Sequence, residues 1–234
     1  MKIKNLCLIC AKGKSSGLKN KNLRKIKNKT LFEITSEHIL KSKLIDKVIV
    51  STDSKNITRI AKKYGFDVPF VRPKYLCQKL SPEWEVWKHA LKYFYKANGY
   101  YPKKLIVCPC TSPNRDSGII DKAIKKFNLL KSDVLISICK TNLSPSFNMV
   151  KINKKNRLEI YQKSKKNIFN RQEANQAYQV STNIYVINPK HVLNNKNIFQ
   201  SNKIDYIEID RYSSLDIDDK HDLLLAKLSI KKNV

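Results

Sequence analysis

Two acidic residues near the end of the chain have the spacing of a metal site. Asp216 and Asp218 stand two positions apart in the stretch Ser-Leu-Asp-Ile-Asp. In an extended segment, residues two apart point to the same side, so both carboxylates can reach one point. Carboxylate oxygens suit Mg²⁺ that is bound together with substrate phosphates. We therefore predict a magnesium site here, with Asp219 and Asp222 capping the next helix; the alternative is that all four acids form one helix N-terminal cluster.

A basic loop near the start of the chain has the composition of a phosphate-binding loop. It runs from Ala11 to Asn22, directly after an apolar run. Gly13 and Gly17 allow the backbone to curl around a ligand, and exposed N–H groups can hold phosphate oxygens. Lys12 and Lys21 would offset the charge of a triphosphate. The spacing matches neither a Walker A loop nor G-x-G-x-x-G, so a solvated lysine-rich loop is the alternative interpretation.

A third polar segment, Cys110 to Arg115, places two hydroxyl groups and a guanidinium group after an apolar run. Such a turn at the end of a strand can hold the edge of a base, a ribose or a phosphate. It equally fits an ordinary turn into a helix, with Asp116 or Ser117 as the N-cap. The segment alone does not decide between the two.

Short apolar runs alternate with amphipathic patterns along the chain, which predicts an α/β fold with a Rossmann-like, doubly wound and mostly parallel sheet. We expect strands at residues 5–10, 48–53, 105–108, 134–138, 181–187 and 204–209. We expect helices after Thr30 and after Ser54, across 83–97, around 119–127 and across 223–228. Ligands bind beyond the carboxyl ends of the strands in such sheets. The loops that should converge there are 11–22, 51–54, 72, 109–115 and 211–218.

The pattern weakens between residues 140 and 176, which are polar, irregular and rich in Lys and Asn. We interpret this segment as an inserted arm, a type of insertion that often makes dimer contacts. Residues 1–234 otherwise read as a single domain. No apolar run reaches the roughly 18 residues of a membrane-spanning helix, and the first apolar run is too short for a secretory signal.

The formal net charge of +28 is typical of proteins that bind nucleic acid or anionic membranes. Here the lysines are spread along the whole chain, and no aromatic residues alternate with them in a basic stripe. We therefore favour a lysine-biased composition without a nucleic-acid partner. An RNA- or DNA-binding module is the alternative, and it depends on the charge alone.

Most of the six cysteines lie in apolar, strand-like runs. Cys7 and Cys10 form a C-x-x-C motif, but no second pair stands at zinc-like spacing and the four histidines are scattered. Free cysteines pack as small apolar residues. We expect reduced, buried thiols and therefore a cytoplasmic location.

Taken together and in order, these segments resemble the cytidylyltransferases that activate acidic sugars, the CMP-sialic acid synthetase family. The family's first loop has the form A-R-x-G-S-K-G-I-P-x-K-N, which is matched by Ala11, Ser15, Gly17, Lys21 and Asn22. Its V-V-S-T-D-S, T-S-P-x-R and S-x-D-I-D motifs are similar to residues 49–54, 111–115 and 214–218, and Ala61 to Gly65 and Arg72-Pro73 fall at the expected distances. The resemblance covers nearly the whole chain.

The resemblance implies a nucleotide-diphospho-sugar transferase type of fold, with residues 140–176 as a dimerisation arm. It implies catalytic roles for Lys21, Asp216 and Asp218, with Mg²⁺ on the two acids. The nucleotide-binding residues that it implies are Ala11, Lys12, Gly13, Ser15, Gly17, Lys21, Asn22, Arg72, Ser81 and Thr111. On the sugar side it implies Gln179 and Arg171.

The chain departs from the family pattern at several positions. Lys12 replaces an Arg and keeps the charge but loses the bidentate fork. Ser16 replaces a Lys, and Pro109-Cys110 replaces a Gln-Pro pair, which removes an amide that could read a base. The other departures are Lys19 for Pro, Lys79-Leu80 for an acidic pair, and residues 179–182 for an Arg-x-Asn-Gly stretch. The identity of the sugar and the selectivity for the nucleotide therefore stay open.

The activity implied by the resemblance is a nucleophilic substitution at the α-phosphate of CTP. The nucleophile would be the anomeric hydroxyl of an acidic 2-keto sugar, a sialic acid-like nonulosonate, and pyrophosphate would leave. We expect CTP and an acidic sugar as ligands, a homodimer, and neither a membrane nor a nucleic-acid partner. The alternatives are the same fold acting on 3-deoxy-octulosonate, on a di-amino nonulosonate or on a neutral sugar, and a degenerate nucleotide-binding homologue.

Overall fold

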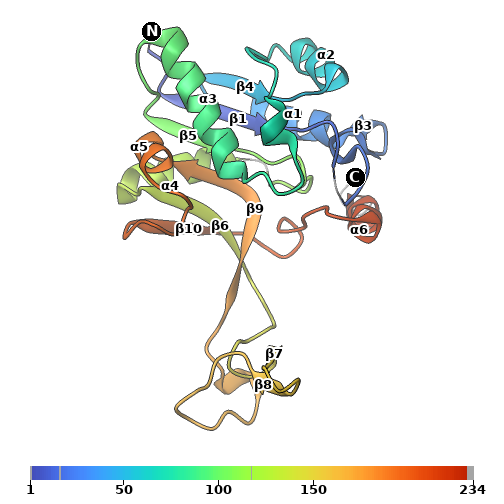
Figure 1. The fold of residues 1–234 in the computed structure, drawn as a ribbon, viewed down its shortest axis with the longest axis vertical. Helices are drawn as coiled ribbons and strands as arrows, with labels where there is room; N and C mark the ends of the chain where they lie inside the picture. Colours follow the sequence, from blue (N-terminus) through green and yellow to red (C-terminus); the bar gives the residue numbers. More distant parts are fainter. Residues whose placement is uncertain (1, 16, 117, 231–234) are drawn as a thin grey trace.

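The computed structural model describes residues 2–15, 17–116 and 118–230. Its centre is a six-stranded sheet with the strand order β10-β6-β9-β5-β1-β4 (Figure 1). Strand β1 is parallel to β4 and β5, and β10 is parallel to β6, whereas β9 is antiparallel to both of its neighbours. The predicted mostly parallel sheet is confirmed. The bounds are β1 Asn5–Cys10, β4 Lys47–Ser51, β5 Lys104–Val107, β6 Val134–Lys140, β9 Tyr178–Ile187 and β10 Ile204–Glu208.

Helices cover both faces of the sheet, as a doubly wound fold requires. Helices α1, α2, α4 and α6 contribute buried side chains to one core cluster, and α3 and α5 contribute to the other. The bounds are α1 Leu31–Leu40, α2 Lys55–Lys63, α3 Glu83–Asn98, α4 Ile119–Leu130, α5 Pro189–Asn194 and α6 Lys220–Ile230. The shorter elements are η1 Lys21–Leu23, β2 Lys25–Ile26, β3 Lys29–Thr30, η2 Lys74–Cys77, β7 Val150–Ile152, β8 Leu158–Ile160 and η3 Arg171–Glu173.

Strand β1 illustrates why an apolar run with no polar alternation becomes a central strand. Cys7 and Ile9 point into one core cluster, while Leu6 and Leu8 point into the other. All four side chains are fully buried. Truncating one of the large aliphatic side chains to Ala should cost about 2–5 kcal/mol. The strand that leads into the basic loop is thus held rigidly on both faces.

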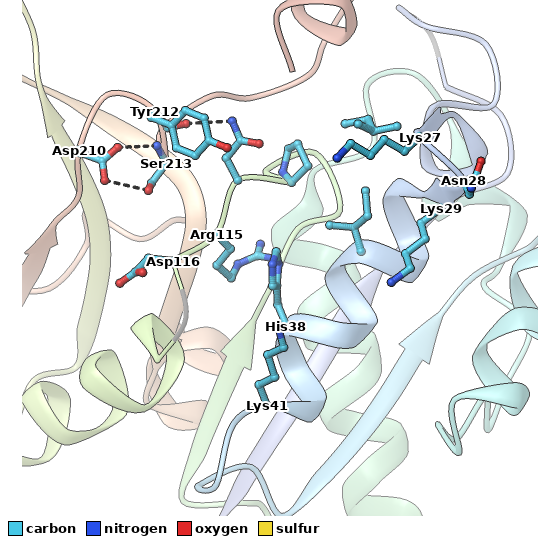
Figure 2. A pocket seen from close by; sticks show the side chains of 14 residues that line it. Lys27, Asn28, Lys29, His38, Lys41, Arg115, Asp116, Asp210, Tyr212 and Ser213 are labelled. Atoms are coloured by element: carbon cyan, nitrogen blue, oxygen red, sulfur yellow. Dashed lines mark hydrogen bonds between the residues drawn. The ribbon is translucent and has the colours of Figure 1, made fainter. Parts of the chain in front are cut away.

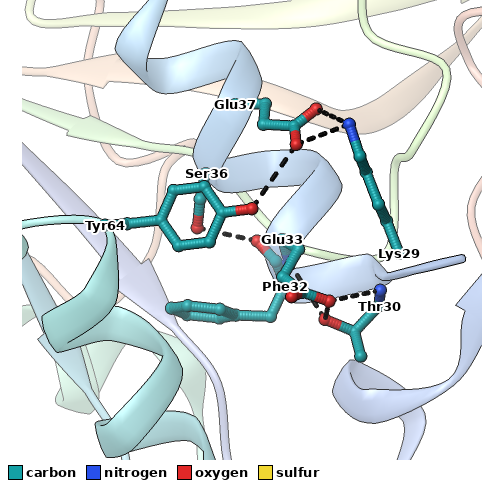
Figure 3. A network of polar contacts seen from close by, with 7 residues as sticks. All are labelled: Lys29, Thr30, Phe32, Glu33, Ser36, Glu37 and Tyr64. Atoms are coloured by element: carbon teal, nitrogen blue, oxygen red, sulfur yellow. Dashed lines mark hydrogen bonds and ion pairs between the residues drawn. The ribbon is translucent and has the colours of Figure 1, made fainter.

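Helix α1 is fixed to the segment before it by a network of polar contacts (Figure 3). The Thr30 hydroxyl accepts from the Glu33 N–H at 3.2 Å, and the Glu33 carboxylate accepts from the Thr30 N–H at 2.7 Å, which makes a capping box. Burial alone would raise the pKa of Glu33. The hydrogen bonds that its carboxylate accepts from the Thr30 N–H and hydroxyl outweigh this effect, so the pKa is lowered. Glu37 pairs with Lys29 at 2.7 Å and accepts from the Tyr64 hydroxyl. The chain just after the basic loop is therefore anchored to α1 and α2.

Other helix boundaries follow local signals in the sequence. The Ser54 hydroxyl accepts from the Ile57 N–H and caps α2, as predicted. Gly65 follows the end of α2 with φ +74°, a conformation that glycine adopts at little cost. None of the helices formed by the described residues has the length and apolar character needed to cross a lipid bilayer.

Residues 141–177 form an arm that extends far from the sheet (Figure 1). Strands β6 and β9 pair through Lys140 and Tyr178 and then separate, and the small hairpin β7–β8 lies near the far end. Several large apolar side chains of the arm are exposed to solvent. These are Leu143, Val150, Ile152, Leu158, Tyr161 and Phe169.

Candidate active site

A cleft of about 520 Å³ lies beyond the carboxyl ends of β1, β4 and β5. We call it the strand-end cleft. Its lining comes from the loop after β1, from the segment between residues 72 and 86, from the turn after β5 and from the loop before α6. Eight of the predicted nucleotide-binding residues line it, together with both predicted metal ligands. The eight are Lys12, Ser15, Gly17, Lys21, Asn22, Arg72, Ser81 and Thr111.

The two ends of the chain meet in this cleft. Lys21 Nζ lies 2.8 Å from Asp218 Oδ1, and the Lys21 side chain is only 17% exposed. The backbone also packs closely, because a Cβ added to Gly17 would lie 2.5 Å from the Asp218 carbonyl oxygen. Glycine at this position thus lets the basic loop approach the acidic loop. The sequence-based expectation that these loops converge is confirmed.

The basic loop is shaped by its own polar contacts. Asn22 is 7% exposed and its amide donates to the Lys12 carbonyl at 3.0 Å. The ammonium group of Lys12 donates to the Gln78 carbonyl on the opposite wall at 3.3 Å. The Gly13 N–H donates to the Asp53 carboxylate at 2.6 Å, which ties the loop to the end of β4. Ser16 lies outside the described residues.

Two of the residues expected to bind nucleotide do not line the strand-end cleft. Ala11 is fully buried in the core, and its N–H continues the sheet by donating to the Ser51 carbonyl at 3.0 Å. The Gly13 N–H is occupied by Asp53, and a Cβ added to Gly13 would lie 3.1 Å from the Ser54 Cβ. Both residues serve the shape of the loop, because their donors are already used within the protein.

The opposite wall of the cleft is held by Arg72 and Ser81. Arg72 is 5% exposed; its Nε donates to the Ser51 hydroxyl at 3.0 Å and its Nη2 to the Ser51 carbonyl at 2.6 Å. The Ser81 hydroxyl donates to the Tyr75 carbonyl at 2.5 Å and accepts from the Gln78 N–H. Arg72 therefore brings a positive charge to the cleft without a carboxylate partner among the described residues.

The four acids around the start of α6 divide into two pairs, and the predicted capping role of Asp219 and Asp222 is confirmed. Asp219 accepts from the N–H groups of His221 and Asp222, and Asp222 accepts from those of Asp218 and Asp219. These two acids cap α6. Asp216 and Asp218 face the strand-end cleft instead, and Asp216 Oδ1 is buried without a hydrogen-bond partner.

The donor set of Asp216 and Asp218 fits a hard divalent cation. Two carboxylates at one edge of a phosphate-sized cleft are the typical protein ligands of Mg²⁺, which takes its other ligands from substrate and water. The unpartnered Asp216 oxygen is an acceptor that a cation would satisfy. In the part of the chain that the structure describes, no cluster of three or more His, Cys, Asp or Glu has a metal-binding arrangement.

A second hollow of about 680 Å³ adjoins the cleft, and we call it the arm-side hollow. It shares Thr182 and Asp216 with the cleft. Gln179, which was predicted on the sugar side, lines it together with Lys140 and Arg211. Arg171, the other predicted sugar-side residue, lies in η3 within the arm and lines neither space. The extended arm carries it away from the cleft of its own chain.

Glu83 is a cleft residue that the sequence motifs did not reveal. It is the first residue of α3 and its side chain is exposed on the cleft side. Loss of water around the carboxyl group raises the pKa of Glu83; the charge of Arg72 opposes this, and the charge of Asp216 adds to it. The only signal in the sequence was its place after Pro82 at the start of a helix.

Arg115, the arginine of the turn after β5, does not face the strand-end cleft. Its guanidinium group donates to the carbonyls of Pro109 and Asn183, at distances of 2.8 to 3.0 Å. It lines a separate space of about 870 Å³ next to α1, which we call the α1 cavity (Figure 2). There burial lowers the pKa of His38 to about 4, and the positive charges of Arg115 and Lys41 add to the effect. Arg115 therefore stabilises the turn by binding backbone carbonyls and does not face the cleft. This favours the interpretation of the segment as an ordinary turn, at least for this arginine.

Comparison with known proteins finds relatives that match this chain over nearly its whole length. The family model described as cytidylyltransferase matches residues 6–224. The chain is 30% identical to post-translational flagellin modification protein B of Campylobacter coli, over 97% of this chain and 95% of that protein. It is 34% identical to N-acylneuraminate cytidylyltransferase of Escherichia coli O18:K1:H7, over 100% of this chain but only 54% of the relative.

The solved structure of CMP:2-keto-3-deoxy-manno-octonic acid synthetase complexed with CTP has the same fold. It superposes with a TM-score of 0.70 and covers 99% of this chain and 100% of its own. The sequence identity is 14%.

Proposed function

Because this chain belongs to the cytidylyltransferase family, we propose that it couples CTP to an acidic 2-keto sugar of the sialic acid-like nonulosonate class. The products are a CMP-sugar and pyrophosphate. The observation that carries the proposal is the contact of Lys21 with Asp218 at 2.8 Å, inside a cleft that also contains Arg72 and Asp216. It places cationic groups for a triphosphate beside acids suited to a metal. The name of the E. coli relative supports the choice of sugar class.

The triphosphate would lie against the basic loop. Lys21 and Lys12 supply positive charge from one side, and Arg72 supplies it from the other. Such groups accelerate phosphoryl-type transfers when they are already in place as charge develops on the phosphates. The fixed positions of these side chains, held by Asp218, Gln78 and Ser51, support this role.

Asp216 and Asp218 would hold the magnesium ion. When bound there, the ion would neutralise charge on the α-phosphate and polarise its P–O bonds. The buried, unpartnered oxygen of Asp216 supports this assignment. Lys21 already pairs with Asp218, and the other N–H donors of its ammonium group can bind the phosphates from the same position.

The acceptor sugar would lie in the arm-side hollow, next to Asp216. Arg211 and Lys140 line this hollow and can hold the sugar carboxylate, while Gln179 can bind hydroxyl or acylamino groups. The anomeric oxygen forms a bond to the α-phosphorus, and the bond from that phosphorus to the bridging oxygen of pyrophosphate breaks. The hydroxyl proton passes to solvent.

A panel of sugars tests this proposal directly. CTP and Mg²⁺ are supplied with N-acylneuraminate, di-amino nonulosonates, 3-deoxy-octulosonate and a neutral hexose, and pyrophosphate release is measured. We expect turnover with at least one nonulosonate and no more than background with the neutral sugar. Turnover with the neutral sugar alone, or tight CTP binding without turnover on any sugar, would contradict the proposed function.

We further propose a homodimer built through the arm, and a cytoplasmic location. In the β7–β8 hairpin, Ile152 is 68% exposed and Leu158 is 71% exposed. A second copy of the arm could cover these apolar side chains. Six free thiols, of which four are buried, support a reducing compartment. Sedimentation should give twice the chain mass, and Ile152→Lys with Leu158→Lys should shift it to the monomer. A monomeric wild-type protein at micromolar concentration would rule out the dimer.

A further inference from the structure

Glu83 supplies a carboxylate to the strand-end cleft that the reaction proposed above does not use. Its side chain is exposed on the cleft side, and the residues around its carboxyl group are Arg72, Trp87, Cys10 and Asp216. No described cation lies within ion-pair distance of it. The nearby Trp87 indole N–H is buried without a hydrogen-bond partner. Glu83 lines the strand-end cleft, so its carboxyl oxygens are acceptors that a ligand in the cleft can reach.

Few groups of a nucleoside triphosphate could bind such an acceptor. The phosphates carry only acceptor oxygens and negative charge, so Glu83 would repel them. The remaining donors are the ribose hydroxyls and the amino group of the base. The acceptor sugar is excluded in this arrangement, because Glu83 does not line the arm-side hollow.

The position of Glu83 relative to Asp216 decides between ribose and base. Glu83 and Asp216 line the same cleft of about 520 Å³, and the charge of Asp216 contributes to the raised pKa of Glu83. If Asp216 holds the ion at the α-phosphate, a neighbouring side chain faces the group attached to that phosphate. That group is the ribose, whereas the base lies one ring farther away. Carboxylates bind ribose hydroxyls in the same manner in dinucleotide sites.

We propose that Glu83 is a specificity-determining residue that accepts a hydrogen bond from the ribose hydroxyls of CTP. The inference rests on the proposed function, because it takes the α-phosphate to lie at Asp216 and Asp218. Glu83 thereby distinguishes ribonucleotides from deoxyribonucleotides. It also orients the ribose so that the α-phosphate faces the sugar.

The test compares CTP with 2′-deoxy-CTP, 3′-deoxy-CTP and UTP. Their binding to the full chain is measured by calorimetry in the presence of Mg²⁺, and kcat/KM is measured with the sugar that the panel identifies. We expect wild-type protein to prefer CTP over at least one deoxy form by about ten- to hundredfold, since a site built around a hydroxyl rejects the analogue without it. Glu83→Ala should reduce that ratio to near one, and Glu83→Gln should give an intermediate ratio.

Glu85 provides the matched control. It lies on the same helix, is exposed, and pairs with Lys88 at 3.2 Å. Glu85→Ala should leave the ratio of CTP to deoxy-CTP unchanged. If Glu83→Ala weakens CTP and both deoxy forms equally, or changes only the preference for CTP over UTP, the ribose assignment fails while the proposed function stands. If wild-type protein does not bind CTP, both fail.

Discussion

The strand-end cleft and the α1 cavity are each lined by a buried arginine from a loop, but the partners of the two guanidinium groups differ. Arg72 is 5% exposed and Arg115 is 4% exposed. Among the described residues, the side chain of Arg72 donates hydrogen bonds to Ser51 alone, and Arg72 lines the cleft. Arg115 is bound by the carbonyls of Pro109 and Asn183, which join the turn after β5 to β9.

The comparison teaches that burial of an arginine does not identify a binding residue. A buried charge needs compensation, and neither arginine has a carboxylate partner among the described residues. At Arg115 the compensation comes from backbone carbonyls within the protein. At Arg72 it can come from the phosphates of a ligand. Residues of the cleft should therefore affect catalysis, and residues of the α1 cavity should affect stability.

The largest effect is expected from Asp218→Asn in the cleft. A neutral amide is a poor Mg²⁺ ligand and also loses the ion pair with Lys21. Pyrophosphate release should fall at least a thousandfold, while the free energy of unfolding changes by less than about 1 kcal/mol, the usual limit for an exposed ion pair. Asp222→Asn is the matched control, since Asp222 caps α6, and it should keep most of the activity. Wild-type turnover by Asp218→Asn would refute the metal assignment.

The two arginines can be compared directly by substitution with lysine. Arg115→Lys loses hydrogen bonds to two buried carbonyls, so the free energy of unfolding should fall by about 2–3 kcal/mol. Arg72→Lys keeps a positive charge but loses the planar guanidinium group that can make two parallel hydrogen bonds. KM for CTP should therefore rise about tenfold, with a smaller loss of stability than for Arg115→Lys. Denaturant unfolding and steady-state kinetics measure the two effects. If each variant showed the other's defect, the division between cleft and cavity would be wrong.

Gly17→Ala probes the close approach of the two loops. The added Cβ would lie 2.5 Å from the Asp218 carbonyl oxygen, so one loop must move. Since a displacement of about 1 Å can cost a hundredfold in rate, kcat/KM for CTP should fall about ten- to hundredfold. Gly13→Ala is the milder control, because its Cβ would lie 3.1 Å from the Ser54 Cβ. Equal activity of Gly17→Ala and wild type would show that the loops do not pack this tightly.

Near neutral pH, the smallest effect is expected at His38 in the α1 cavity. Burial lowers its pKa in the folded protein to about 4, whereas the unfolded chain binds the proton near the ordinary value of 6.5. The unfolded state thus binds more protons between pH 6.5 and 4, and stability falls as the pH decreases through this window. The slope from this group is at most about 1.4 kcal/mol per pH unit. His38→Gln should remove that part of the slope in denaturant unfolding, and an unchanged slope would contradict the assignment.

The local signals in the sequence account for much of the fold. Continuous apolar runs such as that of β1 predicted the buried strands, and Thr30 and Ser54 marked the starts of α1 and α2. The pairing of Asp216 with Asp218, apart from the capping acids, followed from the period of an extended segment. These features depend on neighbouring residues, so periodicity and side-chain type are sufficient to predict them.

Other features depend on residues far apart in the chain. The antiparallel direction of β9 and its place between β5 and β6 are set by the return of the chain from the arm. The burial of Ala11, the use of the Gly13 N–H by Asp53 and the turning of Arg115 toward α1 could not be read from a loop motif. Each depends on which acceptor the folded chain brings within hydrogen-bond distance.

The sequence by itself determined that this chain forms a doubly wound sheet and has a basic loop and an acid pair of the cytidylyltransferase type. Side-chain type and spacing carry that information. Only the tertiary structure decided that Lys21 meets Asp218, that Glu83 joins the cleft and that Arg115 leaves it. The physical reason is that hydrogen bonds and charge interactions act over a few ångströms, and only the packing of the sheet and helices brings groups nearly 200 residues apart within that range.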